Sequence, residues 1–281
     1  MKLFIIALGI IIGYVLTEKT RLLSKHKQRV DVFGNPVPLG SGSMFDDIAP
    51  YYDITNKIMS LGLDNYWRNN MINELDLSGD SCKKIIDIAT GTGDVAIKIA
   101  KKLKTSYKLY NIDCEKPYVW GLDPSINMLS YASDKASGNP DIQFIHGDAT
   151  KMPKLSRSSF HHATMSFGIR NIKNRLMAIK EIKRVIKKNG TFIVMEFTAP
   201  QLGPQGSMLA PVANVFIKYV IPLMGSISSL GHNEEYKHLS DSIFNFPSPS
   251  EFNLELEQAG FKSCTYKNVF QGVVYLWICR K

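Results

Sequence analysis

Short apolar runs alternate along this chain with longer stretches in which apolar residues recur every three or four positions. The short runs are rich in Ile, Val and Phe and suit strands of a parallel sheet that is covered on both faces. The predicted strands cover residues 85–88, 118–122, 142–148, 160–167 and 191–197. The last part of the chain, 261–279, alternates like an antiparallel hairpin. We therefore expect five β/α alternations and a hairpin that closes one edge of the sheet.

Other signals predict the segments around these strands. Residues 44–75 hold two aromatic-rich helical patches and are expected to form a helical cap. Residues 105–117 are polar and irregular, as in a surface insertion. A helix over 173–188 is expected to end at Asn189-Gly190, because these residues are typical helix stops. The segment Ser248 to Glu251 fits a capping box at a helix start.

Residues 200–230 interrupt the alternation with an apolar helical insertion after the fifth strand. Pro211 and Pro222 limit any helix there to about ten residues, which is too short to span a bilayer. The apolar side chains fit ordinary core packing, an apolar wall for a substrate, or a dimer face.

The first thirty residues have a character of their own. Leu3 to Leu16 is uncharged but shorter than the about 20 residues that a spanning helix needs, and a basic flank follows it. The pattern favours a membrane anchor, with an organellar targeting segment or a secretory signal as alternatives. The positive flank is expected to keep the next domain on the cytoplasmic or matrix side. Residues 31–43 are a Pro, Gly and Ser linker, so one domain is expected over 44–281.

Composition and charge narrow the class of protein. With 44% hydrophobic and 21% charged residues, the chain is ordinary for a globular protein. The net charge is +9, of which the first thirty residues carry +5. This distribution indicates an anionic membrane surface near the N-terminus more than a nucleic-acid partner. The four cysteines show no C-x-x-C spacing, so a reducing compartment and no structural metal are expected.

The most informative stretch is Gly91-Thr92-Gly93, which follows the first strand and precedes a helix. Strand, glycine-rich turn and helix together make the first unit of a nucleotide-binding α/β domain. The turn matches the dinucleotide pattern, and it also fits a tight turn with no ligand. Because Asp87 and Asp94 flank the glycines, a cationic ligand suits the turn better than a pyrophosphate.

Polar residues also follow the other predicted parallel strands. Asp123 ends the second strand, where a carboxylate can accept hydrogen bonds from both hydroxyls of a ribose or begin the next helix. Asp148 and Ala149 follow the third strand, and Ser166 ends the fourth. Since carboxyl ends of parallel strands meet at one edge of a sheet, these residues are expected to share a cleft.

Several motifs together resemble a known family. The run from Asp87 to Gly93 resembles motif I of class I S-adenosylmethionine (SAM) methyltransferases. Five further motifs resemble the ubiquinone/menaquinone biosynthesis C-methyltransferases, namely Tyr52 to Asn56, Met59 to Gly62 with Trp67, Ser166 to Asn171, Arg184 to Lys187 with Gly190 and Glu196-Phe197, and Tyr236 to Pro247. The resemblance implies an α/β, Rossmann-like class I methyltransferase fold with a mostly parallel seven-stranded sheet, a C-terminal antiparallel hairpin and a helical insertion after strand five. The chain departs from the family pattern at Asp64, where many members have His.

This resemblance also implies an activity. The SAM methyl group would pass to a ring carbon of a polyprenylated benzoquinol in ubiquinone biosynthesis, with a demethylmenaquinol as the alternative acceptor. The enzyme would be membrane-associated, on the matrix side of the mitochondrial inner membrane, as a homodimer or within a quinone-biosynthesis complex, without nucleic acid. The implied cofactor-binding residues are Gly91, Thr92, Gly93, Asp123, Asp148, Ala149 and Ser166. Arg170 and Asn171 are the implied catalytic residues, although a salt bridge that holds the loop would also explain Arg170.

Other residues and other classes stay open. The ring must lose a proton to a base or an activated water, and His232 is one candidate. His161 and His162 are expected to cap or to face solvent, and Tyr52 to cover the active site or to pack in the core. A dinucleotide oxidoreductase would need an acid about 20 residues after the turn, whereas Asp123 lies farther along the chain. A non-catalytic scaffold of a quinone-synthesis complex is the remaining alternative.

Overall fold

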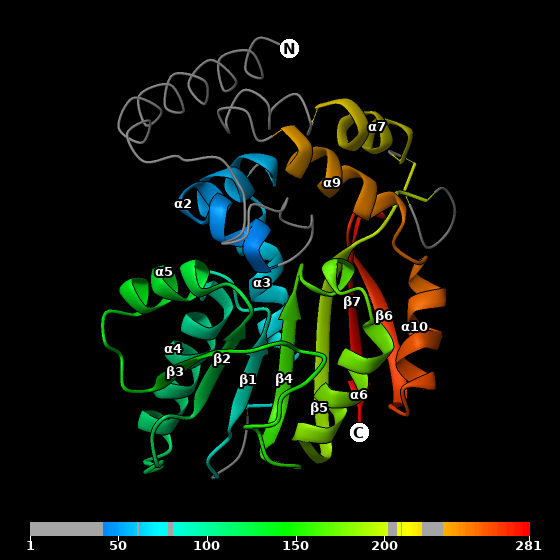
Figure 1. Cartoon of the computed structure of the whole chain (residues 1–281). Helices are drawn as coiled ribbons and strands as arrows, with labels where there is room; N and C mark the ends of the chain where they lie inside the picture. Colours follow the sequence, from blue (N-terminus) through cyan, green and yellow to red (C-terminus); the bar gives the residue numbers. More distant parts are fainter. Residues whose placement is uncertain (1–41, 61, 78–80, 202–206, 209, 221–232) are drawn as a thin grey trace.

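The computed structural model describes residues 42–281 except 61, 78–80, 202–206, 209 and 221–232. Its centre is a seven-stranded sheet in the order β3-β2-β1-β4-β5-β7-β6 (Figure 1). The strands are β1 (Ile85–Ile88), β2 (Val119–Asp123), β3 (Ile142–His146), β4 (Phe160–Ser166), β5 (Ile186–Phe197), β6 (Lys262–Phe270) and β7 (Val274–Arg280). The pairs among β1 to β5 are parallel, whereas β7 pairs antiparallel with β5 and β6. The predicted α/β fold with its C-terminal hairpin is confirmed.

Helices cover both faces of the sheet and its upper edge (Figure 1). The helices are α2 (Gly42–Met59), α3 (Asp64–Asn73), α4 (Asp94–Leu109), α5 (Ile126–Ala136), α6 (Arg175–Val185), α7 (Ala210–Val215), α9 (Asn233–Phe244) and α10 (Pro249–Gln258), with a 3-10 turn η1 (Ile169–Asn171) and a π-helical turn η2 (Phe216–Val220). One core layer joins the sheet to α6 and α10, and the other joins it to α3 and α4. The predicted helical cap over 44–75 is therefore confirmed as α2 and α3.

The predicted end of one helix is wrong. Helix α6 ends at Val185, and Ile186 already pairs with Phe160 as part of β5. Asn189 has a φ of 64°, and a Cβ on Gly190 would lie 2.3 Å from the His161 carbonyl oxygen. The two residues thus form an irregularity within β5, where the register to β4 shifts. A bulge and a helix stop both favour Asn and Gly, so local composition alone does not separate them.

Three other boundaries differ or fall outside the structure. Helix α4 continues to Leu109, so only the later part of the expected insertion at 105–117 is irregular. Helix α2 begins at Gly42, two residues before the expected domain start. The expected anchor at 1–30 lies outside the described residues, as does most of the linker. Within the described residues, no helix is long and apolar enough to cross a membrane.

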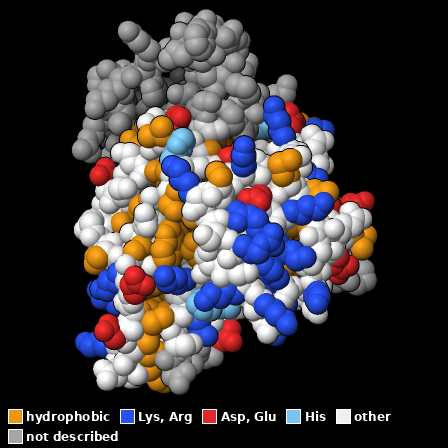
Figure 2. All heavy atoms as spheres, turned by 60° about the horizontal axis from the view of Figure 1, so that its bottom comes forward, with side chains coloured by type: hydrophobic (Ala, Val, Ile, Leu, Met, Phe, Trp, Pro, Cys, Tyr) orange, Lys and Arg blue, Asp and Glu red, His pale blue; other side chains and the backbone are white. Residues whose placement is uncertain are grey.

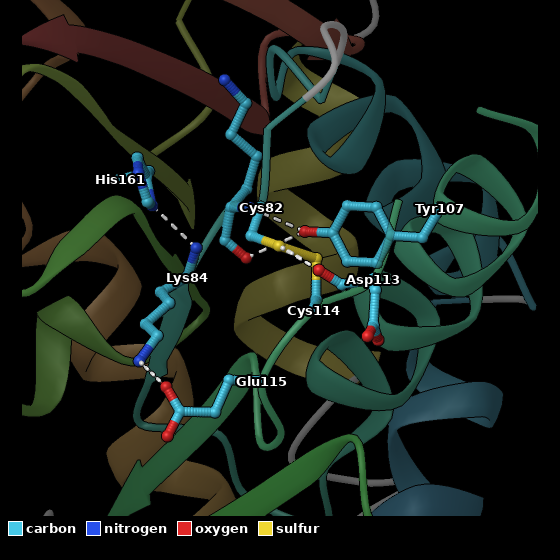
Figure 3. The surroundings of a disulfide bond; sticks show 8 residues. Cys82, Lys84, Tyr107, Asp113, Cys114, Glu115 and His161 are labelled. Carbon is cyan, nitrogen blue, oxygen red and sulfur yellow. Dashed lines mark hydrogen bonds and ion pairs between the residues drawn. A yellow bond between two sulfur atoms is a disulfide. The ribbon is translucent and has the colours of Figure 1, made fainter. Parts of the chain in front are cut away.

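The expectation of reduced cysteines is wrong for this structure. Cys82 and Cys114 form a disulfide beside β1, with their Cα atoms 5.7 Å apart (Figure 3). Cys264 and Cys279 form a second one across the β6–β7 hairpin. The partners are 32 and 15 residues apart in the sequence, and the sheet topology brings each pair together. Cysteine spacing along the chain does not report such proximity, which is why the sequence analysis missed the bonds.

The amino ends of the parallel strands lie at the end of the molecule opposite the cap. Figure 2, which brings this end forward, shows Lys and Arg side chains gathered on part of its surface. Burial and the neighbouring charges of Arg157, Lys183 and Arg184 lower the pKa of the C-terminal Lys281. The basic surface is therefore remote from the carboxyl ends of the strands, where the predicted site residues lie.

Candidate active site

The site lies where the sheet order reverses. Strand β1 pairs with β2 on one side and with β4 on the other, so the chain segments after β1 and β4 lead in opposite directions. In open α/β sheets this switch point leaves a crevice at the carboxyl ends of the strands. Two neighbouring pockets open there, beneath α2 and α3.

The glycine-rich turn shapes the floor of one pocket. Gly91 and Gly93 have φ values of 55° and 81°, in the left-handed region that favours glycine. A Cβ on Gly93 would lie 3.0 Å from both the Ala132 methyl group and the Phe144 ring, so the helix start packs closely on its neighbours. The Gly91 amide donates a hydrogen bond to Asp123 Oδ2 over 2.8 Å, which joins the ends of β1 and β2.

The two acids that flank the turn bind protein groups. Asp87 is 1% exposed and accepts hydrogen bonds from Thr90 and Thr164, each over 2.6 Å. Burial raises the pKa of Asp87 to about 7. Asp94 forms ion pairs with Arg68 and Lys135. Neither carboxylate lines either of these two pockets, so the structure does not place them there against a cationic ligand as the sequence suggested.

Five of the seven expected cofactor-binding residues line one pocket, which we call the cofactor pocket. They are Gly91, Asp123, Asp148, Ala149 and Ser166, and apolar side chains including Leu122, Met128 and Ile172 complete the wall. The other two, Thr92 and Gly93, do not line it. The Thr92 hydroxyl instead donates a hydrogen bond to Asp53 over 2.6 Å and so ties α2 to the turn.

The polar groups of the cofactor pocket are partly unsatisfied. Asp123 is 5% exposed and accepts from the amides of Gly91 and Ser125, and burial raises its pKa to about 6. Asp148 accepts from the Thr150 amide. Ser166 Oγ is buried and, among the described residues, has no hydrogen-bond partner. A buried hydroxyl without a partner is costly, so a polar ligand atom fits here.

The second pocket, which we call the acceptor pocket, lies between α2, α3, η1 and α9. It shares Phe45, Tyr52, Phe167 and Asn171 with the cofactor pocket, so the two chambers meet at these side chains. The remaining walls are largely apolar and aromatic, with polar groups from Asn56, Ser60, Asp64, Arg68, Arg170 and His238. Both implied catalytic residues, Arg170 and Asn171, therefore lie at the junction or in this chamber.

Arg170 is held by a buried ion pair. Its Nη1 donates to Glu196 Oε1 over 2.7 Å and to the Phe167 carbonyl oxygen over 2.8 Å, and its Nε donates to Ser242 Oγ over 3.3 Å. The side chains of Arg170 and Glu196 are 8% and 0% exposed. The alternative that Arg170 holds its loop is thus a real part of its role, because one guanidinium joins the residue after β4 to β5 and α9.

The structure also locates the other candidates. Tyr52 lines both pockets, whereas His161 accepts a hydrogen bond from the Lys84 amide at the far end of β4, and His162 is only 7% exposed. His232 lies outside the described residues. His238, which lines the acceptor pocket, is not among the residues predicted from the sequence. Its place within the motif Tyr236 to Pro247, one helical turn before Ser242, was the sequence signal that could have identified it.

The residues present fit SAM. An acid that accepts from two amides, an orphaned hydroxyl and apolar walls can hold a ribose, a polar amino-acid group and an adenine ring. The arrangement of seven strands with a reversed final hairpin and a site at the switch point defines a class I SAM-dependent methyltransferase.

A model of the ubiE/COQ5 methyltransferase family matches residues 40–281, and the chain belongs to this family. A curated relative from Campylobacter jejuni, named ubiquinone/menaquinone biosynthesis C-methyltransferase UbiE, is 37% identical over 85% of this chain and 96% of its own length. The protein of the same name from Syntrophotalea carbinolica is 35% identical over 83% and 91%. These results confirm the resemblance seen in the sequence.

Solved structures share the fold at low identity. A SAM-dependent methyltransferase from Aquifex aeolicus has a TM-score of 0.51 and 18% identity, over 80% of this chain and 97% of that chain. Phosphoethanolamine N-methyltransferase 2 from Haemonchus contortus, solved with S-adenosyl-L-methionine, has a TM-score of 0.52 and 12% identity, over 77% and 52%. These structures show the fold, and the family match over residues 40–281 makes this chain a SAM-dependent methyltransferase with SAM as its cofactor.

Proposed function

We propose that this protein transfers a methyl group from SAM to a ring carbon of a polyprenylated benzoquinol in ubiquinone biosynthesis, of the 2-methoxy-6-polyprenyl-1,4-benzoquinol type. The observation that carries the proposal is the pair of chambers that meet at Tyr52, Phe167 and Asn171. A flat aromatic ring suits the acceptor chamber, since Phe45, Trp67 and Phe197 also line it. The names of the bacterial relatives support quinone C-methylation.

The proposed chemistry needs few groups. Bound SAM supplies an electrophilic methyl group on a sulfonium ion. Loss of a proton from a ring hydroxyl makes the adjacent carbon nucleophilic, and positioning the two partners in line supplies much of the remaining rate. Asn171 lines both pockets, so its side-chain amide lies where it can orient a ring oxygen.

Arg170 serves the acceptor side through its charge. A guanidinium carries hydrogen-bond donors and no acceptor, so it cannot take the ring proton. In the proposed reaction it stabilises a developing phenolate from the pocket wall while its ion pair with Glu196 fixes its place. Gly91, Asp123, Asp148, Ala149 and Ser166 would hold the cofactor, as the pocket lining supports.

The alternative acceptor is a demethylmenaquinol, because the names of the relatives include both quinones. Deletion of the gene and extraction of the quinones separates the two. Accumulation of an unmethylated benzoquinol supports the proposal, and accumulation of demethylmenaquinol identifies the alternative. A normal quinone profile in the deletion strain would contradict both.

We further propose that the enzyme acts at a membrane surface, where a polyprenyl quinol resides. Besides the expected N-terminal anchor, an exposed apolar face supports this, because Val212, Val215 and Tyr219 are 67%, 55% and 61% exposed at helical spacing. Lys218 stands beside Tyr219 and suits anionic lipid. Mitochondrial placement, a homodimer and a quinone-biosynthesis complex stay predictions, as does the absence of a nucleic-acid partner.

Vesicle sedimentation tests this surface in the full chain. The double variant V212E/V215E should bind anionic vesicles several-fold more weakly than the wild type, because two carboxylates would enter an interfacial face. The matched control is L254E, since Leu254 is 54% exposed on α10. Equal losses in the two variants would count against a specific membrane face.

A further inference from the structure

His238 is the one histidine that lines the acceptor pocket in the described part of the chain. It lies on α9, on the same face as Ser242 one turn later. Its Nε2 is buried and, within the described residues, has no hydrogen-bond partner. A buried ring nitrogen without a partner is unfavourable, so a ligand hydroxyl in this chamber would satisfy it.

The charges around His238 keep it ready to accept a proton. Burial and the positive charge of Arg170 lower its pKa, while Asp241 on its own helix opposes this shift. Glu196 neutralises much of Arg170, and Asp64 and Arg68 face the same chamber from α3. At neutral pH the imidazole is therefore neutral and holds a basic lone pair.

The other titratable groups of the chamber are less suited to act as a base. Burial raises the pKa of Tyr52, so its phenol stays protonated. Asp64 accepts hydrogen bonds from Arg68 over 2.6 Å and from Ser60 over 3.2 Å, which occupies both carboxylate oxygens. Arg68 and Arg170 carry hydrogen-bond donors and no acceptor, so neither can take a proton from the ring.

Arg170 also helps to hold the part of α9 that carries His238. Arg170 Nε donates to Ser242 Oγ, and that hydroxyl donates to the Leu239 carbonyl oxygen over 2.8 Å. The ion pair between β5 and η1 is thereby connected to the turn of α9 that carries His238. Arg170 is in this respect a positioning residue for His238.

From this geometry we propose that His238 is the general base that takes the hydroxyl proton from the acceptor ring. The assignment rests on the proposed quinol substrate. The O–H bond breaks and its proton moves to the imidazole, while the ring carbon next to the oxygen forms a bond to the methyl carbon. The bond between methyl and sulfur breaks, and its electron pair stays on sulfur as a neutral thioether. The methylated carbon then loses its own proton and the oxygen regains one, so one proton is released overall.

Methyl transfer by the full-length H238Q variant tests the assignment. We expect kcat to fall about 100-fold or more, in the range for loss of a general base, with the SAM Kd unchanged. The wild-type kcat should rise with pH and level off below the ordinary pKa of histidine, whereas the residual rate of H238Q should keep rising with hydroxide concentration. Added imidazole should restore part of the rate to H238A. The matched control is H161Q, because His161 lies at the opposite end of β4 from the pockets.

Two results would overturn this role. One is an H238Q enzyme within threefold of the wild-type kcat with the same pH profile. The other comes from an NMR titration that does not depend on turnover, in which a short-chain benzoquinol added to the full chain with S-adenosylhomocysteine leaves the His238 ring resonance unchanged. A wild type that binds SAM but methylates no quinol would instead refute the proposed function, and the titration still decides whether His238 meets the ring hydroxyl.

Discussion

At the scale of single residues, Asp123 is the acid on which the cofactor pocket depends. It accepts hydrogen bonds from the Gly91 and Ser125 amides and also lines the pocket. It therefore links the glycine-rich turn to the start of α5. Asp87, which was an equally strong candidate from the sequence, is buried and accepts hydrogen bonds from two threonine hydroxyls. Burial distinguishes the two acids, and the sequence pattern around them does not.

The raised pKa of Asp123 predicts how SAM binding depends on pH. Because the folded value is about 6, the carboxylate is charged above that pH and becomes protonated as the pH falls through it. Protonation removes acceptor capacity for the ribose hydroxyls, so SAM affinity should fall steadily below pH 6. Calorimetric titration between pH 5 and pH 8 measures this. D123N should bind weakly at every pH, and a D123N profile that still falls through pH 6 would assign the titration to another group.

Arg170 illustrates why a simple substitution misleads. R170A would leave Glu196 charged and buried without its partner, so the free energy of unfolding should drop by about 3–5 kcal/mol in a urea titration. The double variant R170M/E196M should regain most of that loss while its methyl transfer stays impaired, because the acceptor chamber lacks its cation. Full activity in a stable R170M/E196M enzyme would leave Arg170 with a structural role only.

At the scale of elements, α2 closes the site from above and is tied to the domain by short polar contacts. Asp46 Oδ1 accepts from Ser125 Oγ over 2.6 Å and from the Asn127 amide over 3.0 Å, while Asp53 meets Thr92 and Lys135. Sequence periodicity predicted that this helix is part of a cap. It could not show which acidic side chains bind the helix to the rest of the domain. These pairs join residues about 40 to 80 positions apart.

Loosening α2 should weaken cofactor binding without unfolding the protein. D46A removes the carboxylate oxygen that accepts two hydrogen bonds at the start of α5, next to Asp123, and is expected to raise the SAM Kd by about tenfold, in line with about 1.5 kcal/mol for a hydrogen bond to a charged group. Calorimetry gives the Kd, and the melting temperature serves as the control. An unchanged Kd would mean that α2 closes the site by its aromatic contacts alone.

The disulfides can be tested by counting thiols. Because all four cysteines are paired, alkylation of the denatured, unreduced protein should label no thiol. Opening Cys82–Cys114 should lower the free energy of unfolding by about 3–4 kcal/mol on the chain-entropy estimate for its loop. Mass spectrometry after alkylation settles the count, and four labelled cysteines would restore the expectation of a reducing compartment.

At the scale of the whole molecule, the sequence predicted the order of strands and helices well. Apolar runs reflect local burial and glycines mark local turns, so the bounds of β1 to β4 and of the hairpin were predicted to within a few residues. Contacts between distant segments were harder. Neither the Arg170–Glu196 pair nor the approach of His238 leaves a periodic signal, because each depends on how separate loops meet at one edge of the sheet.

The cofactor pocket was predicted better than the acceptor pocket for the same reason. Class I methyltransferases build the cofactor side from strand ends, and five of the seven expected residues line that pocket. The acceptor side is built from α2, α3, η1 and α9, which come from four parts of the chain. The sequence could name its motifs only by resemblance, and it proposed His232 rather than His238.

We propose that this chain brings SAM and a quinol ring together in two adjoining chambers. Transfer of labelled methyl from SAM to short-chain benzoquinol and naphthoquinol analogues, with the methylated atom identified by mass spectrometry, tests it most directly. We expect one new methyl group on a ring carbon next to a ring oxygen, with the benzoquinol as the better acceptor. Methylation at oxygen, or no transfer to either ring by a protein that binds SAM, would contradict it.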